Sequence, residues 1–319
     1  MSARVDVAVV SWNTRDVTVA ALRRLLDTDQ GVEVRLLVRD NGSTDGTVEA
    51  LRAAVPEAEV DAGRDNVGFA RGMNTLLARS DAPWFLPLNS DAWPDPGALG
   101  ALVEAAARHP RAAAVAPRIE RPDGSLEHST NPFPSLSVAA LTATGLYHRL
   151  SPRLAWRKQL FGVWQHDSER AVDWAVGAAL LMRREALDEI GGFDERFFMY
   201  AEDVEWCWRA HRRGWEIWFT PQAVVRHVGN ASGEQNYGRR RTQAWVANTY
   251  RFYRSTHGPV STTAYHALNA AGAGRAIAGS LVKRDRDRAR YWRDHLRAHL
   301  RRYPGTDGGP PTTSGATGG

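Results

Sequence analysis

Two groups of side chains in this sequence could do chemistry, and the first is the tripeptide Asn89-Ser90-Asp91. It follows an apolar run at residues 84–88, which predicts a strand that ends at this point. Hard cations such as Mg²⁺ bind through one or two carboxylates and through the phosphate oxygens of a substrate. Asp91 therefore suits a cation held largely by a nucleotide, although an Asp here could also cap a turn or a helix.

His227 is the side chain that could complete such a cation site. It closes a predicted strand at residues 223–226 and precedes Gly229. Taken alone, a histidine in this place is more often structural than a metal ligand. If its strand ends at the same sheet edge as Asp91, the pair offers the nitrogen and oxygen donors that Mn²⁺ or Mg²⁺ accepts.

The second group is the carboxylate pair Glu202 and Asp203, at the predicted start of a helix. The helix dipole favours acidic residues in a first turn, and that alone could explain the pair. A carboxylate that stays ionised beside a substrate hydroxyl can also act as a general base. The run at residues 197–200 would exclude water from such a site, although aromatic clusters more often belong to the core.

Upstream of these groups, polar residues and glycines follow the predicted strands. Asp40, in the sequence Asp40-Asn41-Gly42-Ser43, could accept hydrogen bonds from a nucleobase or a ribose. Gly68 and Gly72 would let a phosphate approach the backbone near the start of a helix. Each feature is weak by itself, because Asp-Asn-Gly-Ser is also an ordinary turn.

The elements that must position these residues alternate between short apolar strands and amphipathic helices. We expect strands at residues 5–10, 34–38, 84–88 and 112–116, and helices at residues 17–26, 47–54, 68–78 and 97–108. Such alternation predicts a mainly parallel sheet with helices on both faces, which binds ligands beyond the carboxyl ends of its strands. No GxGxxG or P-loop sequence follows the first strand, which counts against dinucleotide-binding and ATPase functions.

The rest of the chain is less regular. Residues 120–170 mix Pro, Ser and aromatic residues, as in a loop-rich insertion that contacts an acceptor. Beyond it we expect an apolar segment at 172–182, a helix at 184–190, short strands at 216–219 and 223–226, an aromatic-rich helix at 244–254, a basic helix at 275–302 and a disordered tail at 304–319.

The composition is that of a globular protein, with 43% hydrophobic and 24% charged residues. A single cysteine, Cys207, excludes an internal disulfide framework and favours a reducing, cytoplasmic setting. The N-terminal residues do not read as a signal peptide. The weakly polar runs at residues 136–147 and 174–182 are too short to span a bilayer.

Positive charge is concentrated near the C-terminus. Residues 275–302 contain ten Lys or Arg and three Asp, a local balance of +7 in a chain whose net charge is +5. No nucleic-acid-binding motif accompanies this basic segment, so we expect no nucleic-acid partner. Its apolar side chains could share one helix face that binds an anionic membrane surface or docks on the protein's own core. They are Ile277, Leu281, Trp292, Leu296 and Leu300.

Five segments occur in one order along the chain. They are Ser11-Trp12-Asn13, Asp40-Asn41-Gly42-Ser43, Asn66-Val67-Gly68-Phe69-Ala70-Arg71-Gly72-Met73-Asn74, Asn89-Ser90-Asp91, and Gly191-Gly192-Phe193-Asp194-Glu195 followed by Glu202-Asp203. Together they resemble the segments of family 2 glycosyltransferases of the GT-A fold, particularly of the bacterial rhamnosyltransferase-like branch. The likeness covers roughly residues 4–255.

This resemblance implies an α/β fold, with a Rossmann-like, mainly parallel central sheet flanked by helices. One GT-A domain would cover residues 1–258, with a nucleotide-binding part at about 1–118 and an acceptor and catalytic part at about 119–258. A basic C-terminal helical extension would follow at residues 259–303, before the tail at 304–319.

The resemblance also implies a role for each site residue. The residues expected to hold the nucleobase and ribose are Ser11, Asn13 and Asp40, and those expected near the diphosphate or the sugar are Asn66, Gly68 and Asn74. The tripeptide Asn89-Ser90-Asp91 occupies the DXD position, with Asp91 and His227 as metal ligands. Because Asn89 replaces the first carboxylate, Asp91 is the motif's one acidic ligand. Asp203 matches the catalytic base, with Glu202 as its partner.

These roles imply an inverting glycosyltransferase that depends on Mg²⁺ or Mn²⁺. Asp203 would deprotonate an acceptor hydroxyl, whose oxygen attacks the anomeric carbon from the face opposite the departing diphosphate. A cation at Asp91 and His227 would neutralise the charge that grows on that diphosphate. Rhamnose from dTDP-rhamnose is the first donor to test, and the acceptor would be a glycan, a lipid-linked glycan or a small natural product.

Two alternatives stay open at this point. The chain could be a family 2 transferase that uses a UDP- or GDP-sugar, such as one carrying glucose, galactofuranose, N-acetylglucosamine or mannose. It could also be a non-catalytic protein that binds nucleotide sugars or a membrane surface. In each case we expect a cytoplasmic protein, which residues 275–302 could hold at the inner face of the cell membrane.

Overall fold

The computed structural model describes residues 3–146, 164–229 and 241–301. The chain forms two compact units. The first contains the described residues 3–131 and 164–229, and the second contains residues 132–146 and 241–301. The second unit is therefore built from two stretches that are far apart in the sequence.

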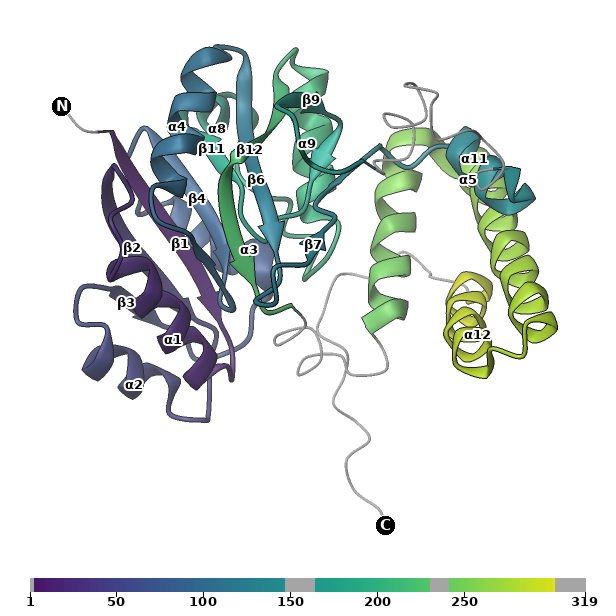
Figure 1. Cartoon of the computed structure of the whole chain (residues 1–319), viewed down its shortest axis with the longest axis horizontal. Coiled ribbons are helices and arrows are strands. Elements are labelled where there is room, and N and C mark those ends of the chain that lie inside the picture. The colour runs from purple at the N-terminus through teal and green to yellow at the C-terminus, as the bar shows by residue number, and fades with distance from the viewer. Residues whose placement is uncertain (1–2, 147–163, 230–240, 302–319) are drawn as a thin grey trace. The chain divides into compact units, whose positions relative to one another are not determined.

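The first unit is built on a ten-stranded sheet with the order β3-β2-β1-β4-β11-β6-β12-β5, to which β7 adds beside β6 and β9 beside β12 (Figure 1). Its strands are β1 (Arg4–Ser11), β2 (Glu33–Asp40), β3 (Glu59–Ala62), β4 (Trp84–Asn89), β5 (Ala92–Pro94), β6 (Ala112–Glu120), β7 (Leu126–Glu127), β9 (Arg170–Val172), β11 (Leu181–Arg183) and β12 (Glu216–His227). A separate two-stranded sheet pairs β8 (Thr130–Asn131) with β10 (Trp174–Ala175). The pairs β1–β2, β1–β4, β2–β3 and β6–β12 are parallel, so the predicted mainly parallel sheet is confirmed.

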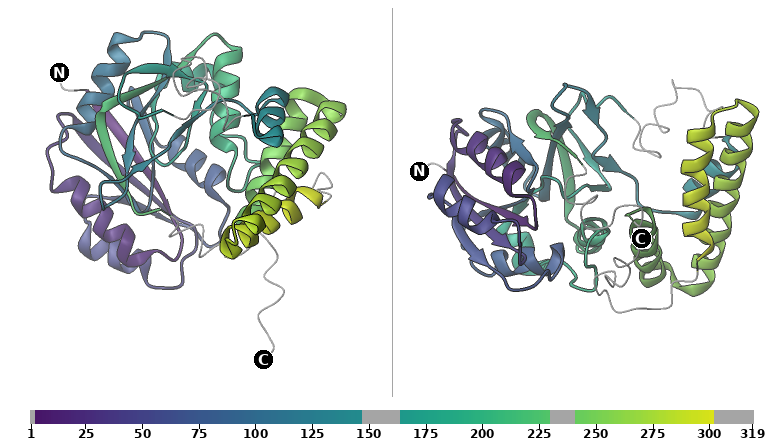
Figure 2. Two further views of the ribbon diagram at one scale, coloured as in Figure 1. Left: turned by 45° about the vertical axis from the view of Figure 1, so that its right-hand side comes forward. Right: turned by 90° about the horizontal axis from the view of Figure 1, so that it is seen from below.

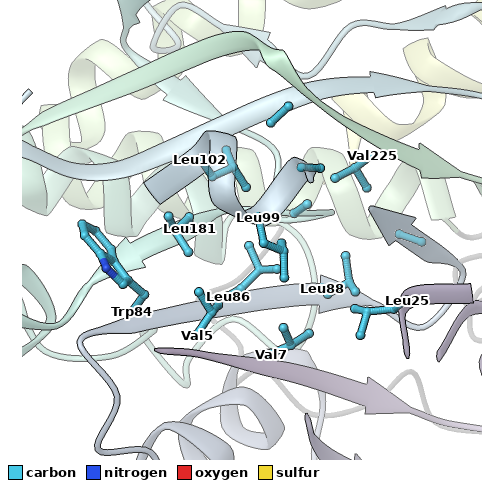
Figure 3. Close-up of a cluster of buried hydrophobic side chains, with 14 of the residues drawn as sticks. Val5, Val7, Leu25, Trp84, Leu86, Leu88, Leu99, Leu102, Leu181 and Val225 are labelled. Carbon is cyan, nitrogen blue, oxygen red and sulfur yellow. The ribbon is translucent and has the colours of Figure 1, made fainter. Parts of the chain in front are cut away.

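Helices cover the sheet of the first unit. They are α1 (Arg15–Leu26), α2 (Thr47–Ala54), α3 (Phe69–Leu77), α4 (Ala98–Arg108), α8 (Arg184–Ile190) and α9 (Glu202–Arg212). The consecutive residues Val7, Ala8 and Val9 of β1 are all fully buried, which requires cover on both faces of the sheet. On one face, Val7 and Leu86 belong to the same apolar cluster as Leu99 of α4 (Figure 3).

Some strands differ from the prediction. Residues 216–227 form one strand, β12, whose register against β6 shifts between Thr220 and Val224. The prediction of two short strands was wrong because Pro221 reads as a break, whereas here it lies at a strand irregularity, where proline is tolerated. The strands β3 and β5 were not predicted. Each is short, and β3 is an edge strand without a buried residue.

The second unit contains α5 (Leu136–Thr144), α11 (Arg241–Val282) and α12 (Arg286–Leu300). Figure 2 shows α12 running alongside α11. Tyr250 of α11 joins these two helices, because its hydroxyl lies 2.7 Å from Nδ1 of His299. Near its middle α11 bends at Gly258, whose φ is 78°, and Pro259 follows without a backbone N–H. The GT-A domain at residues 1–258 expected from the sequence stays a prediction.

The predicted single basic helix at residues 275–302 is wrong. Helix α11 ends at Val282, Arg284 has a φ of 57°, and Asp285 caps α12 by accepting a hydrogen bond from the backbone N–H of Arg288. Ile277 and Leu281 therefore belong to α11, whereas Trp292, Leu296 and Leu300 belong to α12. The tail at 304–319 lies outside the described residues. Within the described ranges, no helix has both the length and the hydrophobicity needed to cross a bilayer.

Candidate active site

The carboxyl ends of three parallel strands bring the predicted nucleotide-site residues to one edge of the sheet. Ser11 at the end of β1 lies beside Asp40 at the end of β2. The preceding residue of β1, Val10, pairs with Asn89 at the end of β4. The arrangement follows from parallel pairing, because parallel strands run in the same direction and their carboxyl ends lie at the same edge of the sheet.

Asp91 and His227 meet at this edge. The antiparallel pairing of β5 with β12 places His227 opposite Ala92, the residue after Asp91, and the backbone carbonyl of Asp91 accepts a hydrogen bond from Val228. Oδ1 of Asp91 lies 3.2 Å from Nε2 of His227. Both residues are buried, with exposed fractions of 2% and 7%. Asp91 and His227 thus lie at the same edge of the sheet, as the sequence predicts.

The other ring nitrogen of His227 faces a carboxylate that the sequence did not reveal. Both carboxylate oxygens of Glu127, on β7, lie 3.3 Å from Nδ1 of His227. Burial disfavours the charged ring, but hydrogen bonds to Asp91 and Glu127 outweigh it and raise the pKa of His227 to about 9. In turn, the hydrogen bond to His227 lowers the pKa of Glu127, against the effect of burial. Both ring nitrogens of His227 therefore face a carboxylate, Asp91 on one side and Glu127 on the other.

The side chains at this edge fit a divalent cation that receives its remaining ligands from substrate and water. Neighbouring ligands of an octahedral ion bound at about 2.1 Å lie about 3.0 Å apart. The 3.2 Å between Asp91 Oδ1 and His227 Nε2 is close to that separation. The amide of Asn89 also lies 3.2 Å from the same nitrogen. Among the described residues, no group of three or more His, Cys, Asp or Glu side chains has the arrangement of a metal site. The described protein side chains alone thus provide an incomplete set of cation ligands.

The carboxylate pair lies in the first turn of α9. The two residues before the helix, Tyr200 and Ala201, have φ values of 72° and 74°, an uncommon conformation that turns the chain sharply into the helix. Oδ2 of Asp203 accepts a hydrogen bond of 3.0 Å from the backbone N–H of Gly177, and Oδ1 accepts one of 2.8 Å from Val204. Burial raises the pKa of Asp203, and these backbone hydrogen bonds oppose the rise.

Glu202 differs from its neighbour in its partners. Within the described part of the chain, its Oε2 is buried and has no hydrogen-bond partner. Burial, followed by the nearby charge of Asp203, raises the pKa of Glu202 well above its ordinary value. The pKa of Glu202 is therefore raised further than that of Asp203, whose carboxylate accepts hydrogen bonds from Gly177 and Val204.

A short backbone segment links the carboxylate pair to the Asn89-Ser90-Asp91 turn. Gly177 donates its N–H to Asp203, and the carbonyl of the next residue, Ala178, accepts the N–H of Asn89 at 3.0 Å. Ala179 then forms a bridge with Leu88 of β4. The adjacent residues Gly177 and Ala178 thus bind the carboxylate of Asp203 and the backbone of Asn89. No pattern in the sequence predicts this link.

The side chains predicted to hold the nucleobase and ribose also hold the surrounding loops. Both oxygens of Asp40 accept hydrogen bonds from Ser43, one from its backbone and one from its hydroxyl. Oδ1 of Asn13 accepts the N–H of Thr44 at 2.8 Å, while Ser11 lies in a buried hydroxyl cluster, 3.1 Å from Thr14. The structure brings these residues together and shows them shaping the loops after β1 and β2. Their contact with a nucleotide stays a prediction.

Gly68 lies where the start of α3 meets the loop before α9. Its φ is 87°, and a Cβ atom there would lie 2.5 Å from the carbonyl oxygen of Phe198, so a larger residue cannot fit without movement. Phe69 donates its N–H to the same carbonyl at 2.7 Å. Asn66 accepts the N–H of Gly68 at 3.0 Å, and Asn41, which the sequence analysis gave no role, donates to the carbonyl of Gly68.

Asn74 makes a different set of contacts from those expected near a diphosphate. Its Nδ2 donates to the carbonyl of Phe193, and its Oδ1 accepts the N–H of the same residue, both at 2.8 Å. The side-chain amide also reaches Glu195 at 3.1 Å. Asn74 therefore fastens the Gly191–Glu195 segment to α3, and any contact with the donor stays a prediction.

Two models of known protein families match this chain, and both describe glycosyltransferases. The family model described as glycosyl transferase family 2 matches residues 6–191, which include the turns at Ser11, Asp40 and Asp91. A second model, described as glycosyl transferase family 21, matches residues 153–274, which include Asp203 and His227.

Curated relatives and solved structures agree with this match. An N-acetylglucosaminyl-diphospho-decaprenol L-rhamnosyltransferase of Mycobacterium tuberculosis is 37% identical over 212 residues, which cover 63% of this chain and 68% of that protein. A pre-mycofactocin glycosyltransferase of the same species is 30% identical over 221 residues, 67% of this chain and 43% of that protein. A mannosyltransferase of Pyrobaculum calidifontis, solved with GDP-Man and Mn²⁺, has the same fold, with a TM-score of 0.58 at 18% identity over 94% of this chain and 86% of that one. The chain belongs to glycosyltransferase family 2, in the rhamnosyltransferase-like branch, and is a nucleotide-sugar glycosyltransferase of the GT-A fold.

Proposed function

We propose that the chain transfers rhamnose from dTDP-rhamnose, with inversion, to a hydroxyl of a lipid-linked acceptor glycan. The observation that carries this proposal is the 37% identity to a mycobacterial enzyme named for rhamnosyl transfer to N-acetylglucosaminyl-diphospho-decaprenol. That identity extends over 212 residues, which cover 68% of that enzyme. It also favours an enzyme over a non-catalytic binding protein.

The cation site would be formed by Asp91 and His227, with the donor diphosphate and water as the other ligands. A divalent cation there supplies a positive charge that stabilises the departing diphosphate. The buried pair at 3.2 Å supports this assignment, as does the Mn²⁺ in the archaeal structure of the same fold. Mg²⁺ and Mn²⁺ both suit one carboxylate and one imidazole.

Asp203 would act as the base. Burial raises its pKa, which makes its carboxylate a stronger proton acceptor than a free aspartate. The N–H groups of Gly177 and Val204 fix the carboxylate's direction. Phe197 and Phe198, both buried just before α9, keep water from competing with the acceptor hydroxyl. One displacement then inverts the anomeric carbon, without a covalent intermediate.

A donor and acceptor matrix tests this proposal. The purified chain is incubated with dTDP-rhamnose, UDP-sugars or GDP-sugars, each with an N-acetylglucosaminyl-diphospho-polyprenol, and products are identified by mass spectrometry. We expect a mass increase of one deoxyhexose with dTDP-rhamnose, and an inverted anomeric configuration by NMR. Efficient transfer from a UDP- or GDP-sugar, with none from dTDP-rhamnose, would reject the rhamnose assignment and leave the family intact.

The replacement Glu202→Gln is expected to leave kcat within about threefold of the wild type, because the raised pKa of Glu202 favours its protonated form, which cannot act as a base. The same change should raise the free energy of unfolding at neutral pH. Folded Glu202 keeps its proton at a pH where the unfolded chain has lost it, so wild-type stability falls as pH rises above the ordinary carboxyl pKa. Chemical denaturation of both proteins between about pH 4 and pH 8 measures this, and the difference should shrink towards acid. A lower stability of the variant at neutral pH would show that Glu202 is ionised.

We also propose that the turn between α11 and α12 binds an anionic membrane surface. Leu281 and Val282, at the end of α11, are 57% and 85% exposed. Lys283 and Arg284 follow directly, and Arg286 comes after Asp285, so apolar and cationic side chains lie together at this turn. Apolar residues that enter the interface and basic residues that meet lipid phosphates reinforce one another. This replaces the five-residue face expected from the sequence.

Liposome flotation of the full chain tests this turn. We expect the protein to float with vesicles of phosphatidylcholine and phosphatidylglycerol, less so with phosphatidylcholine alone, and less at high salt. The double variant Leu281→Gln, Val282→Gln should lose most of this flotation. Val260→Gln is the matched control, because Val260 is 86% exposed on the same helix without adjacent Lys or Arg. Equal flotation of the double variant and the wild type would reject the proposal.

A further inference from the structure

We propose that Glu127 is a positioning residue for the cation site. It accepts the Nδ1 proton of His227, so that Nε2, the nitrogen that faces Asp91, is the one that a cation would bind in place of a proton. The inference rests on the proposed role of Asp91 and His227 as cation ligands, and assigns a use to a carboxylate that lies outside the motifs of the sequence.

The two nitrogens of His227 face two different environments. Nδ1 lies 3.3 Å from each oxygen of Glu127, so either oxygen of this carboxylate can accept a hydrogen bond from Nδ1. Nε2 lies 3.2 Å from Oδ1 of Asp91 and 3.2 Å from the Asn89 amide. The ring is thus held between β7 on one side and the Asn89-Ser90-Asp91 turn on the other.

The tautomer of His227 decides whether it can bind a cation. A neutral imidazole has one protonated and one bare nitrogen, and only the bare nitrogen can be a ligand. A carboxylate at Nδ1 holds the proton there and increases the basicity of Nε2, as carboxylate partners do at many histidine metal ligands. Without Glu127, the ring could place its proton on Nε2, where Asp91 would accept it and the ligand would be lost.

The position of Glu127 depends on a tight turn between β6 and β7. The carbonyl of Ser125 accepts the N–H of Arg121, and the carbonyl of Arg121 accepts that of Gly124. This turn pairs Glu127 with Ile119 of β6, and Ile119 in turn pairs with Val225 of β12, two residues before His227. The hairpin therefore presents Glu127 to the end of β12.

Glu120 provides a matched control. It lies on β6 at the same hairpin, but its carboxylate pairs with Arg226 at 2.8 Å and with Arg118 at 2.6 Å. No hydrogen bond or ion pair joins Glu120 to His227 among the described contacts. Removing its charge disturbs the same strands without touching the imidazole, so it reports the purely structural cost of losing a carboxylate here.

The experiment measures Mn²⁺ binding directly, by the EPR signal of free Mn²⁺ in titrations of the full chain with dTDP present. We expect Glu127→Ala to weaken the Kd for Mn²⁺ by about 10–100-fold, the usual effect of losing an outer-shell partner. Glu127→Gln keeps a carbonyl oxygen that can accept the Nδ1 proton, so it should recover at least half of that loss on a logarithmic scale. Glu120→Gln should bind Mn²⁺ within about twofold of the wild type.

The outcomes separate this inference from the proposed cation site. Binding by Glu127→Ala within about twofold of the wild type, or a loss equal to that of Glu120→Gln, would overturn the role of Glu127. Wild-type Mn²⁺ affinity in Asp91→Asn and His227→Ala would instead overturn the cation site itself. Thermal melts of each variant without metal identify any variant that fails to fold. If Glu127→Ala fails to fold, the Mn²⁺ affinity of Glu127→Gln still tests the inference.

Discussion

Replacing Asp203 with Asn is expected to lower kcat for glycosyl transfer by about a thousandfold, because an amide cannot take the proton of the acceptor hydroxyl. The affinity for the nucleotide-sugar donor should change little, since the backbone contacts of Asp203 are to Gly177 and Val204. Single-turnover assays and donor titrations by calorimetry measure the two quantities separately. A drop in kcat with unchanged donor Kd is the signature of a lost base.

Two controls make this prediction specific. Glu202→Gln removes the neighbouring carboxyl and should remain active, so a loss confined to residue 203 identifies the base. The wild type should also lose kcat/KM towards acid with a midpoint above the ordinary Asp value of about 3.9, because burial raises the pKa of Asp203 and the base must be ionised. Transfer by Asp203→Asn within about tenfold of the wild type would place the base elsewhere.

Replacing Asp91 with Asn is expected to lower kcat/KM by roughly 10²–10³-fold at moderate Mn²⁺ concentration, since it removes the one acidic ligand of the cation site. Added Mn²⁺ should restore part of the activity, because His227 and the donor diphosphate remain as ligands. Initial rates measured as a function of Mn²⁺ and of donor concentration would show both effects.

Asp95→Asn is the matched control for this change. Asp95 lies just after β5 and binds Arg226 at 2.8 Å, next to His227 in the chain, and none of the described hydrogen bonds or ion pairs joins it to Asp91 or His227. We expect it to alter stability and to leave the Mn²⁺ dependence unchanged. If Asp91→Asn showed the wild-type Mn²⁺ dependence, or if chelators left wild-type transfer unaffected, Asp91 would not be a ligand.

The sequence predicts the central sheet well, because buried parallel strands are continuous apolar runs and their helices are bounded by glycines. The boundaries of α2 and α8 were predicted to the residue. Gly46, with a φ of 82°, precedes α2, and Gly191, with a φ of 86°, follows α8. Where a break residue occurs inside an element, the same reasoning fails. Pro221 falls within β12. At Gly258 the backbone is not helical, and α11 continues in a new direction after Pro259.

The same contrast holds for the active site. Asp91 and His227 could be predicted to converge, because each directly follows or closes a strand at the same edge. Glu127 could not, because its contact with His227 requires the hairpin of β6 and β7 to fold first. Gly177 contributes a backbone N–H, which every residue except proline possesses, so the sequence carries no sign of it. The loop-holding contacts of Asp40 and Asn74 were likewise invisible.

The backbone link at Gly177 and Ala178 has a consequence for how this enzyme can evolve. A trans peptide holds the Cα atoms of neighbouring residues about 3.8 Å apart, so the anchor of the base and the anchor of the Asn89 turn cannot move far from one another. The catalytic machinery therefore resists being spread to admit a bulkier acceptor. New acceptor preferences must therefore arise at residues other than 176–179.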